Sequence, residues 1–362
     1  MDTDKRFGRR QLLALSAAAL LSPALRLYPS ASAALAGRGA WLSALCCLPP
    51  LLLYLLFFCR FTARRREGEG LAELIARSLG GKTGRAVLGL LALWLLLYTG
   101  FVLRASAERF VVTLFPRSGP GFFVLSLGFS ALLASLCPPR TLVRTARMLL
   151  PGLLSVLLLL LLAALRSAEL ENLLPLTADD ALPVLLGALP VADVLLFGVC
   201  VPAFLLGSAE KRPDDFRALA LWLLGMILLL TALCAAVLGC FGAALTQRLS
   251  LPFFTLVRNL IFFRSLERME ALVVALWLFP DFLLSTLALQ AAQRCLRPAL
   301  ALAAERRWPV WAGGAAAIAA GLLLAPGGEQ LALWSERVIP AVNLFVCLAL
   351  LPIIYIVGRK RL

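Results

Sequence analysis

Ionisable side chains inside long apolar runs are the residues of this sequence best suited to bind or carry charge. Arg104 and Glu108 are four residues apart in one such run, so on a helix they share a face and can pair. Asp281 follows Pro280 in another run and precedes Ser285 by four residues. Charged groups inside a membrane span are costly and usually mark an internal pair or a functional site. We interpret Arg104 and Glu108 as a structural pair and Asp281, with Ser285, as a candidate functional site.

Two other polar residues in apolar runs have simpler interpretations. Tyr98 could line a site, but its large ring also packs well among apolar neighbours. Asp193 lies near the outer end of its run, where water can solvate a carboxylate. We keep Tyr98 as a candidate site residue, and solvation is the simplest interpretation of Asp193.

The composition excludes several kinds of catalytic chemistry. The chain contains no histidine, which rules out histidine-based triads, histidine-ligated metals and histidine proton switches. Its 9 cysteines form no Cys-x-x-Cys motif, and most lie in apolar runs, where cysteine behaves as a small apolar residue. We therefore expect no metal, no cofactor and no enzymatic role.

Composition also defines the class of protein. The 362 residues are 61% hydrophobic and 15% charged, whereas soluble domains are about 25% charged and about half apolar. These proportions predict an integral membrane protein that crosses the bilayer many times. A net charge of +15 would suggest nucleic acid in a soluble protein, but here the positive residues lie between apolar runs, where they set membrane topology. We therefore expect the lipid bilayer as a partner and expect no binding of nucleic acid.

Ten apolar segments are long enough for a membrane helix, which needs at least about 17 residues. They comprise residues 11–29, 39–59, 85–113, 121–137, 146–166, 183–206, 217–243, 268–293, 308–325 and 333–357. Ten crossings place both termini on one side, and most lysines and arginines lie in the connections of that side, which identifies it as the cytoplasm. We expect cytoplasmic tails at 1–10 and 358–362 around a single membrane domain at 11–357. Arg9-Arg10 also resembles a twin-arginine signal, but the many further spans favour a first membrane helix.

Helix-breaking residues recur in the first and sixth segments. The first contains Ser22-Pro23-Ala24, and the sixth contains Pro190 and then a stretch of small and apolar residues before Pro202. Paired interruptions in two halves of a chain are typical of inverted-repeat transporters, in which unwound backbone binds solute at the middle of the membrane. Simple kinks are the alternative, because membrane helices tolerate isolated prolines. The first interpretation predicts ligand contacts from Leu21, Ser22, Pro23, Ala24, Leu25, Phe197, Gly198, Val199, Cys200 and Val201.

A motif at the start of the eighth segment resembles a known family. Glu267-Arg268-Met269-Glu270, followed by Trp277, is similar to the signature of the spore germination permeases, the B subunits of nutrient germinant receptors. Arg104 and Glu108 match a second motif of that family, and Asn172-Leu173-Leu174-Pro175-Leu176 matches a third. The similarity extends over nearly the whole chain, with the motifs in the family's order.

The resemblance implies a fold, a place and a partner set. It implies an all-α protein of the amino acid–polyamine–organocation superfamily, with ten transmembrane helices in a LeuT-like 5+5 inverted repeat. The repeats would be about 11–166 and 183–357, with helices 1 and 6 broken. It implies residence in the inner membrane of an endospore and detection of a small nutrient, often an amino acid. An A-type membrane subunit and a C-type lipoprotein subunit would complete the receptor.

The chain also departs from the family at both predicted breaks. Ser22-Pro23-Ala24 stands where the family often has Gly-x-Gly, and Cys200 stands where it often has glutamate. Cys200 cannot form a salt bridge with an ammonium group. Arg26, close to the first break, favours an anionic group there, unless its side chain extends outward to the membrane surface.

Three functions remain open from the sequence. The chain could be a receptor subunit that senses a nutrient, an active amino acid transporter of the same fold, or a structural membrane partner whose site has degenerated. Fold alone does not distinguish them.

Overall fold

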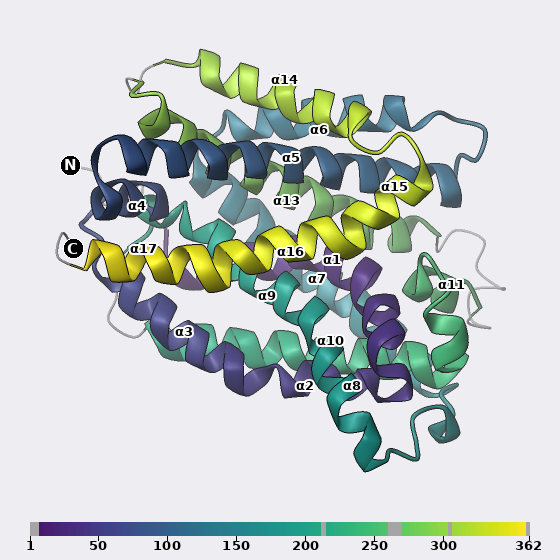
Figure 1. The fold of residues 1–362 in the computed structure, drawn as a ribbon. Coiled ribbons are helices and arrows are strands. Elements are labelled where there is room, and N and C mark those ends of the chain that lie inside the picture. The colour runs from purple at the N-terminus through teal and green to yellow at the C-terminus, as the bar shows by residue number, and fades with distance from the viewer. Residues whose placement is uncertain (1–6, 211–214, 260–269, 303–305, 360–362) are drawn as a thin grey trace.

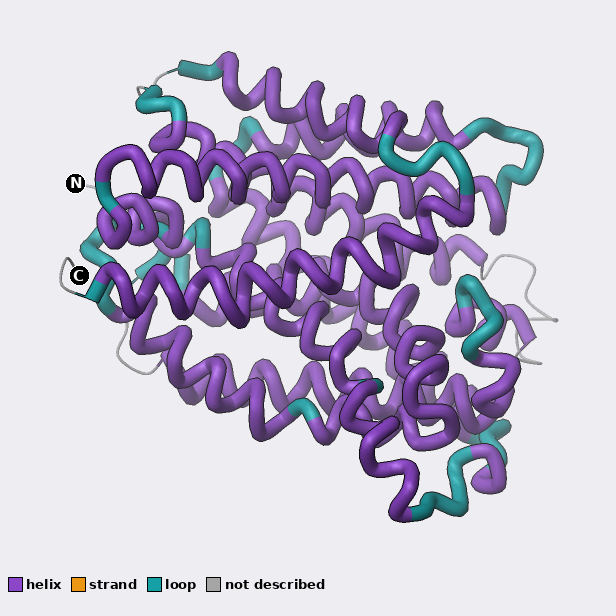
Figure 2. The backbone as a smooth tube through the Cα atoms, viewed as in Figure 1, coloured by secondary structure: helices purple, strands orange, loops and turns teal. Residues whose placement is uncertain are grey.

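The computed structural model describes residues 7–210, 215–259, 270–302 and 306–359, and this part of the chain is almost entirely helical (Figures 1 and 2). Its one β-type pairing is an isolated bridge between Phe7 and Ala209. The α-helices are α1 (Arg9–Ala36), α2 (Ala40–Cys46), α3 (Leu48–Ala63), α4 (Leu71–Leu79), α5 (Gly81–Thr113), α6 (Pro120–Ser135), α7 (Pro139–Leu165), α8 (Ala181–Leu186), α9 (Ala188–Ala203), α10 (Asp215–Thr246), α11 (Pro252–Asn259), α13 (Glu270–Ala299), α14 (Trp308–Leu323), α15 (Gly328–Leu333), α16 (Ile339–Leu344) and α17 (Leu351–Gly358).

Prolines and glycines mark many helix ends. Proline occupies the first turn of α3, α6, α7 and α14, where the N–H that it lacks would have no partner within the helix. Gly37 after α1 and Gly80 between α4 and α5 have φ angles of 54° and 66°, which residues with a side chain rarely adopt. These residues stop the helices abruptly and keep the connections short.

Large apolar side chains cover the outside of the bundle. Leu90, Phe122, Leu159, Leu323 and Ile356 are each between 68% and 76% exposed. So much exposed apolar surface suits contact with lipid and not with water. Seven helical stretches are long and apolar enough to cross a membrane: Tyr28–Ala63, Gly81–Thr113, Pro139–Leu165, Ala178–Ala203, Phe216–Thr246, Val274–Ala299 and Gly328–Gly358. The protein is therefore a multi-pass membrane protein.

Within the described residues, each of the ten apolar segments expected from the sequence lies mainly on one or more of the α-helices. Two of them form apolar helices of only 16 residues, α6 and α14. Both described ends of the chain lie on the same side of the bundle (Figure 1). This placement agrees with an even number of crossings.

The break expected in the first segment is absent, and the break expected in the sixth is wrong in position. α1 continues as a helix through Leu21–Leu25 with Pro23 inside it, and α9 continues through Phe197–Val201. The sixth segment is interrupted instead at Gly187, between α8 and α9. A proline removes a single backbone N–H, so a helix can bend around it without unwinding when a neighbour satisfies the carbonyl left over.

Two serines of α1 donate hydrogen bonds to backbone carbonyls of the sixth segment. Pro202 leaves the carbonyl of Gly198 without its donor four residues on, and the Ser16 hydroxyl donates to that carbonyl at 2.6 Å. The Ser32 hydroxyl donates to the carbonyl of Gly187 at 2.8 Å, at the interruption itself. The Ser16 hydroxyl therefore replaces the hydrogen bond that Pro202 removes, and the Ser32 hydroxyl adds one at the interruption.

α1 lies in the interior of the bundle and packs against α7, α9, α10 and α13 (Figure 1). α5 packs against α13 and α14.

The last segment contains two π-helical turns, Trp334–Val338 and Phe345–Leu350, on either side of α16. Such turns widen a helix locally and are frequent at functional sites. Between these turns, α16 packs against α9, and its Asn343 is buried.

Candidate functional site

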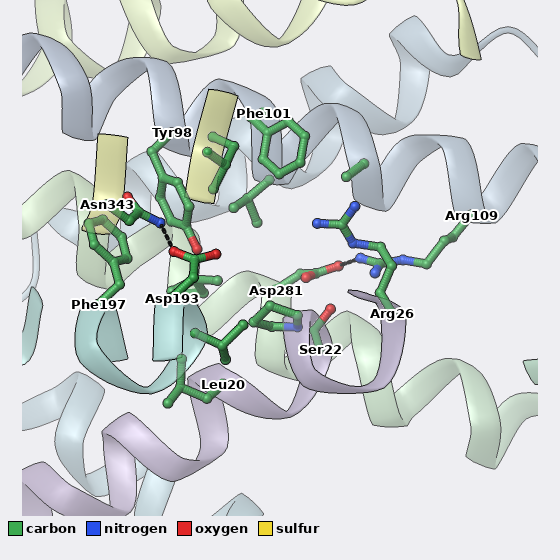
Figure 3. Close-up of a pocket in the computed structure, with 16 residues that line it drawn as sticks. Leu20, Ser22, Arg26, Tyr98, Phe101, Arg109, Asp193, Phe197, Asp281 and Asn343 are labelled. Atoms are coloured by element: carbon green, nitrogen blue, oxygen red, sulfur yellow. Dashed lines mark hydrogen bonds and ion pairs between the residues drawn. The ribbon is translucent and has the colours of Figure 1, made fainter. Parts of the chain in front are cut away.

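A small buried cavity lies where α1, α5, α9, α13 and α16 meet (Figure 3). Its volume of about 20 Å³ is enough for about one water molecule. Four charged side chains face it, among apolar and aromatic neighbours. It is lined by Leu20, Ser22, Pro23, Arg26, Tyr98, Phe101, Val102, Ala105, Arg109, Asp193, Val194, Phe197, Asp281, Leu284, Ile339 and Asn343.

Asp193 forms the acidic end of the cavity. Its side chain is 3% exposed, and Oδ1 accepts a hydrogen bond of 2.8 Å from Nδ2 of Asn343. The Trp94 indole donates to the other end of that amide at 3.0 Å, which fixes its orientation. Figure 3 shows the Tyr98 hydroxyl directed toward the carboxylate. Asp193 therefore lies inside the protein and not in solvent, which corrects the simplest interpretation of its position in the sequence.

Two arginines form the basic end. Arg109 of α5 forms a buried ion pair with Asp281 of α13, through Nη2 and Oδ2. Arg26 of α1 donates to the Ser335 hydroxyl at 3.0 Å, and its guanidinium carbon lies 5.0 Å from the centre of the Phe101 ring. A cation over an aromatic ring gains electrostatic attraction without an opposite charge. Arg26 has no carboxylate partner in the described part of the chain.

Several buried polar atoms around the basic end have no hydrogen-bond partner. They are the Ser22 hydroxyl and Nε and Nη1 of Arg109, whose residues line the cavity, and the hydroxyl of Ser285, which follows Asp281 by one turn but does not line it. Buried polar groups are nearly always paired, so a cluster of unpaired ones marks a place where water or a polar ligand can bind. This part of the cavity therefore offers donors that the protein itself does not use.

Five of the ligand-contact and polar candidates predicted from the sequence face this cavity: Ser22, Pro23, Tyr98, Phe197 and Asp281. Leu25 lines a second small cavity, which adjoins the first at Arg26 and Arg109. Leu21 and Ala24 are buried in the core without lining either cavity.

The remaining α9 candidates lie away from the charged cavity. Gly198 and Val199 line a different hollow, next to Arg9 and Ser16. Cys200 and Val201 line another hollow, whose lining is entirely apolar. Because α9 is an intact helix, its successive residues face different directions, and only Phe197 of the predicted stretch points toward the charges.

Arg104 and Glu108 form the ion pair that their spacing predicts. Nε of Arg104 also donates to the carbonyl of Ala325 at 2.8 Å, just beyond the end of α14. Neither residue lines the cavity. The pair connects α5 to the connection after α14, in agreement with a structural role.

The family motif is only partly within the described residues. Glu267 and Arg268 lie outside them, and Glu270 is the first residue of α13. Trp277 is 5% exposed and packs edge to face against Phe254 of α11, with ring centres 5.6 Å apart. Trp277 lines the second cavity. The motif thus leads into α13, which carries Asp281 one turn further on.

Sequence reasoning missed two residues of the site, Arg109 and Asn343, and left Arg26 undecided between the site and the membrane surface. Asn343 had a detectable signal, since it is an amide inside an apolar run with Pro340 and Pro352 on either side. Arg109 directly follows Glu108, and no spacing rule identified Asp281 as its partner. The structure places Arg26 in the cavity.

A bundle of apolar helices around a buried cavity with charged walls defines a multi-pass membrane protein with a polar site in its interior. The chain belongs to the spore germination protein family, whose sequence model matches residues 9–320. This confirms the family expected from the sequence motifs. No curated protein matches the chain.

Proposed function

We propose that this chain is the B subunit of a spore nutrient germinant receptor, and that it senses a small nutrient in the charged cavity. The family match supports a role in germination as a permease-like membrane protein. The observation that carries the proposal is the meeting of four charged side chains inside the bundle, at Arg26, Arg109, Asp193 and Asp281. Charges inside a membrane bundle are costly and usually mark an internal pair or a functional site, and only two of these four pair with each other.

The size of the cavity determines how sensing would work. Room for about one water molecule does not accommodate a nutrient. Binding therefore requires the surrounding helices to move apart, and a ligand that fits only the wider form shifts the population toward it. Partner subunits can respond to such a shift. We propose an A-type membrane subunit and a C-type lipoprotein subunit as those partners, in the inner membrane of the spore.

The proposed topology has ten crossings, in two halves at about 11–166 and 183–357, with both termini in the cytoplasm. The common side of the two chain ends supports it (Figure 1), as does the concentration of lysine and arginine on that side. This topology depends on the number of crossings and the side of the termini, and it does not require a helix break in either half.

Germination of a deletion strain tests the function. Spores without the gene should lose germination in response to at least one nutrient in a panel of amino acids, sugars and nucleosides, and the wild-type gene should restore it. Ala105→Leu should fill the cavity and abolish the restored response, because Ala105 is buried against it. Ala86→Leu makes the same change on the exposed side of the same helix and should restore normally. Equal responses from both variants would contradict the site.

An active amino acid transporter is the alternative. Uptake of labelled amino acid into proteoliposomes of the purified chain would favour it over a sensor. Germination controlled by the chain without any uptake would favour the sensor.

A further inference from the structure

Two thiols meet inside the bundle, outside the charged cavity. Cys200 lies on α9, and Cys347 lies on the π-helical turn Phe345–Leu350 of the last segment. Their sulfur atoms are 3.4 Å apart, although the two residues are 147 positions apart in the chain. The side chains are 3% and 0% exposed, so the core holds both of them in place. The contact joins two segments that become neighbours only when the whole domain folds.

The surroundings of the pair favour a neutral product over a charged one. The Tyr54 hydroxyl of α3 lies 3.2 Å from the sulfur of Cys200. The hollow beside that sulfur is apolar, with Leu91, Val346 and Leu351 in its wall. A metal ion held by two thiolates would bring charge into this wall, and buried charge without compensation is costly. A disulfide carries no charge, so it is the product that this environment accommodates.

We propose that Cys200 and Cys347 form a reversible disulfide that locks α9 to the last segment. The sulfur atoms have to approach by about 1.4 Å to reach bonding distance, which side-chain rotation can supply. The thiols are buried, so the reaction requires transient opening of the bundle, and we expect the bond to form gradually.

The oxidant is a hydroperoxide, of which hydrogen peroxide is the simplest. One cysteine sulfur attacks a peroxide oxygen and breaks the O–O bond, and its proton passes to the departing hydroxide to give water. This cysteine is then a sulfenic acid. The sulfur of the other cysteine attacks the sulfenic sulfur, which forms the S–S bond and releases a second water. The two thiols lose two electrons and two protons, and the peroxide is reduced to two water molecules.

The position of the pair gives the bond a consequence for sensing, which rests on the function proposed above. Asn343, which donates to Asp193 in the charged cavity, precedes Cys347 by four residues. Asp193 itself precedes Cys200 by two helical turns. The hydrogen bond and the thiol pair thus connect the same two segments at neighbouring levels. Nutrient binding requires the helices around the cavity to move apart, and a covalent bond between these two segments opposes that movement.

Cross-linking of the purified full chain in lipid nanodiscs tests the bond itself. All proteins carry Cys137→Ser, because Cys137 is exposed and can react between chains. After a time course with hydrogen peroxide, we expect peptide mass spectrometry without reduction to find Cys200 joined to Cys347. Dithiothreitol should reverse the link. No link between these two cysteines, at any time or peroxide concentration that leaves the protein folded, would overturn the inference.

Serine variants show whether the link depends on this pair. Cys200→Ser and Cys347→Ser should each abolish it. Cys240→Ser is the matched control, because the sulfur of Cys240 contacts the carbonyl of Ala164 and not a thiol. It should leave the link unchanged. If a variant fails to fold, the cross-link in the protein with Cys137→Ser alone still decides.

Spores test the effect on sensing. Spores with Cys137→Ser alone are compared with spores that also carry Cys347→Ser, with the nutrient that the germination panel identifies. After peroxide, the first should lose the nutrient response and recover it with dithiothreitol. The second should respond throughout, which excludes general damage by peroxide. Equal responses of the two after peroxide, in spores where the link is detected, would show that the disulfide does not lock the receptor.

The two measurements separate this inference from the function on which its consequence rests. A missing link overturns the inference and leaves nutrient sensing untouched. Normal germination of the deletion strain on the whole nutrient panel would overturn the proposed function and the effect of the lock on germination. The link found by mass spectrometry would still establish the modification site in that case.

Discussion

At the scale of single residues, the ion pair between Arg109 and Asp281 holds α5 against α13 beside the cavity. Asp281→Asn should destabilise the protein by about 3–5 kcal/mol, because it leaves a buried guanidinium group without its counter-charge. The double variant Asp281→Asn with Arg109→Gln should recover part of this loss. Unfolding of the purified protein in detergent measures both. A single variant as stable as wild type would show that the pair is not formed.

Ser16 offers a second test at this scale. Its hydroxyl is the donor for the Gly198 carbonyl that Pro202 leaves free. Ser16→Ala should cost about 1–3 kcal/mol, since a buried carbonyl then loses its partner. Ser130→Ala is the matched control, because the Ser130 hydroxyl bonds to its own helix on an exposed face. If the two variants are equally stable, the hydrogen bond from Ser16 to the Gly198 carbonyl does not contribute to the stability of the fold.

The site could be predicted from the sequence only in part. Asp281 and Tyr98 stand out because polar residues in apolar runs are rare. Asp193 was misplaced and Asn343 missed because their burial depends on which helices become neighbours across the bundle, and hydropathy along one segment does not contain that information. Arg26 illustrates the same limit: two directions were open to its side chain, and packing against Phe101 selected one.

At the scale of helices, the close approach of α5 and α14 depends on a glycine. A Cβ atom at Gly100 would lie 2.6 Å from the Cβ of Ala320 and 2.8 Å from the carbonyl of Ala317. Gly100→Ala should therefore destabilise the protein by about 1–3 kcal/mol. Gly89→Ala, on the same helix with no atom within 4 Å of the new Cβ, should be neutral or slightly stabilising. Thermal unfolding of the two variants tests this difference, and equal losses would contradict it.

The connection between α3 and α4 should be sensitive to acid. Glu69 accepts hydrogen bonds from the backbone N–H of Arg66 and from the Arg77 guanidinium. Partial burial alone would raise the pKa of Glu69, but these bonds and the nearby charges hold its pKa below the ordinary value. A lowered pKa means that the folded protein favours the carboxylate. The resulting stabilisation is complete above about pH 4.5 and is lost as the pH falls through the folded-state pKa.

Comparison with Glu69→Gln isolates this effect. The wild type should be the more stable of the two at neutral pH, and the difference in unfolding midpoint should shrink as the pH falls below about 4.5. A difference that is constant across this range would show that the charge of Glu69 makes no contribution.

The helices themselves follow closely from the sequence, whereas their interruptions do not. Apolar run length predicts each segment because lipid leaves the backbone no other way to satisfy its hydrogen bonds. Pro23 and Pro202 were expected to unwind their helices. They do not, because each removes one hydrogen bond and a neighbouring hydroxyl can replace it, as Ser16 does for Gly198. The observed interruption, at Gly187, comes three residues before Pro190, in the first turn of α9.

At the scale of the whole molecule, the short helix α6 tests the proposed topology. If it crosses the membrane, the connection before it is external and the exposed Cys137 after it is cytoplasmic. A membrane-impermeant thiol reagent applied to intact cells should label Ser118→Cys and leave Cys137 unlabelled. Inverted vesicles should give the opposite pattern. Labelling of both positions from one side would remove α6 from the set of membrane crossings.

The central claim is that the cavity between α1, α5, α9, α13 and α16 is where this protein binds its nutrient. An experimental structure of the full chain, determined with the nutrient that the germination panel identifies at saturating concentration, tests it most directly. We expect density for the nutrient between Asp193 and Arg26, with the surrounding helices further apart than they are here. Nutrient density at another position, with this cavity still closed around a single water, would contradict the account.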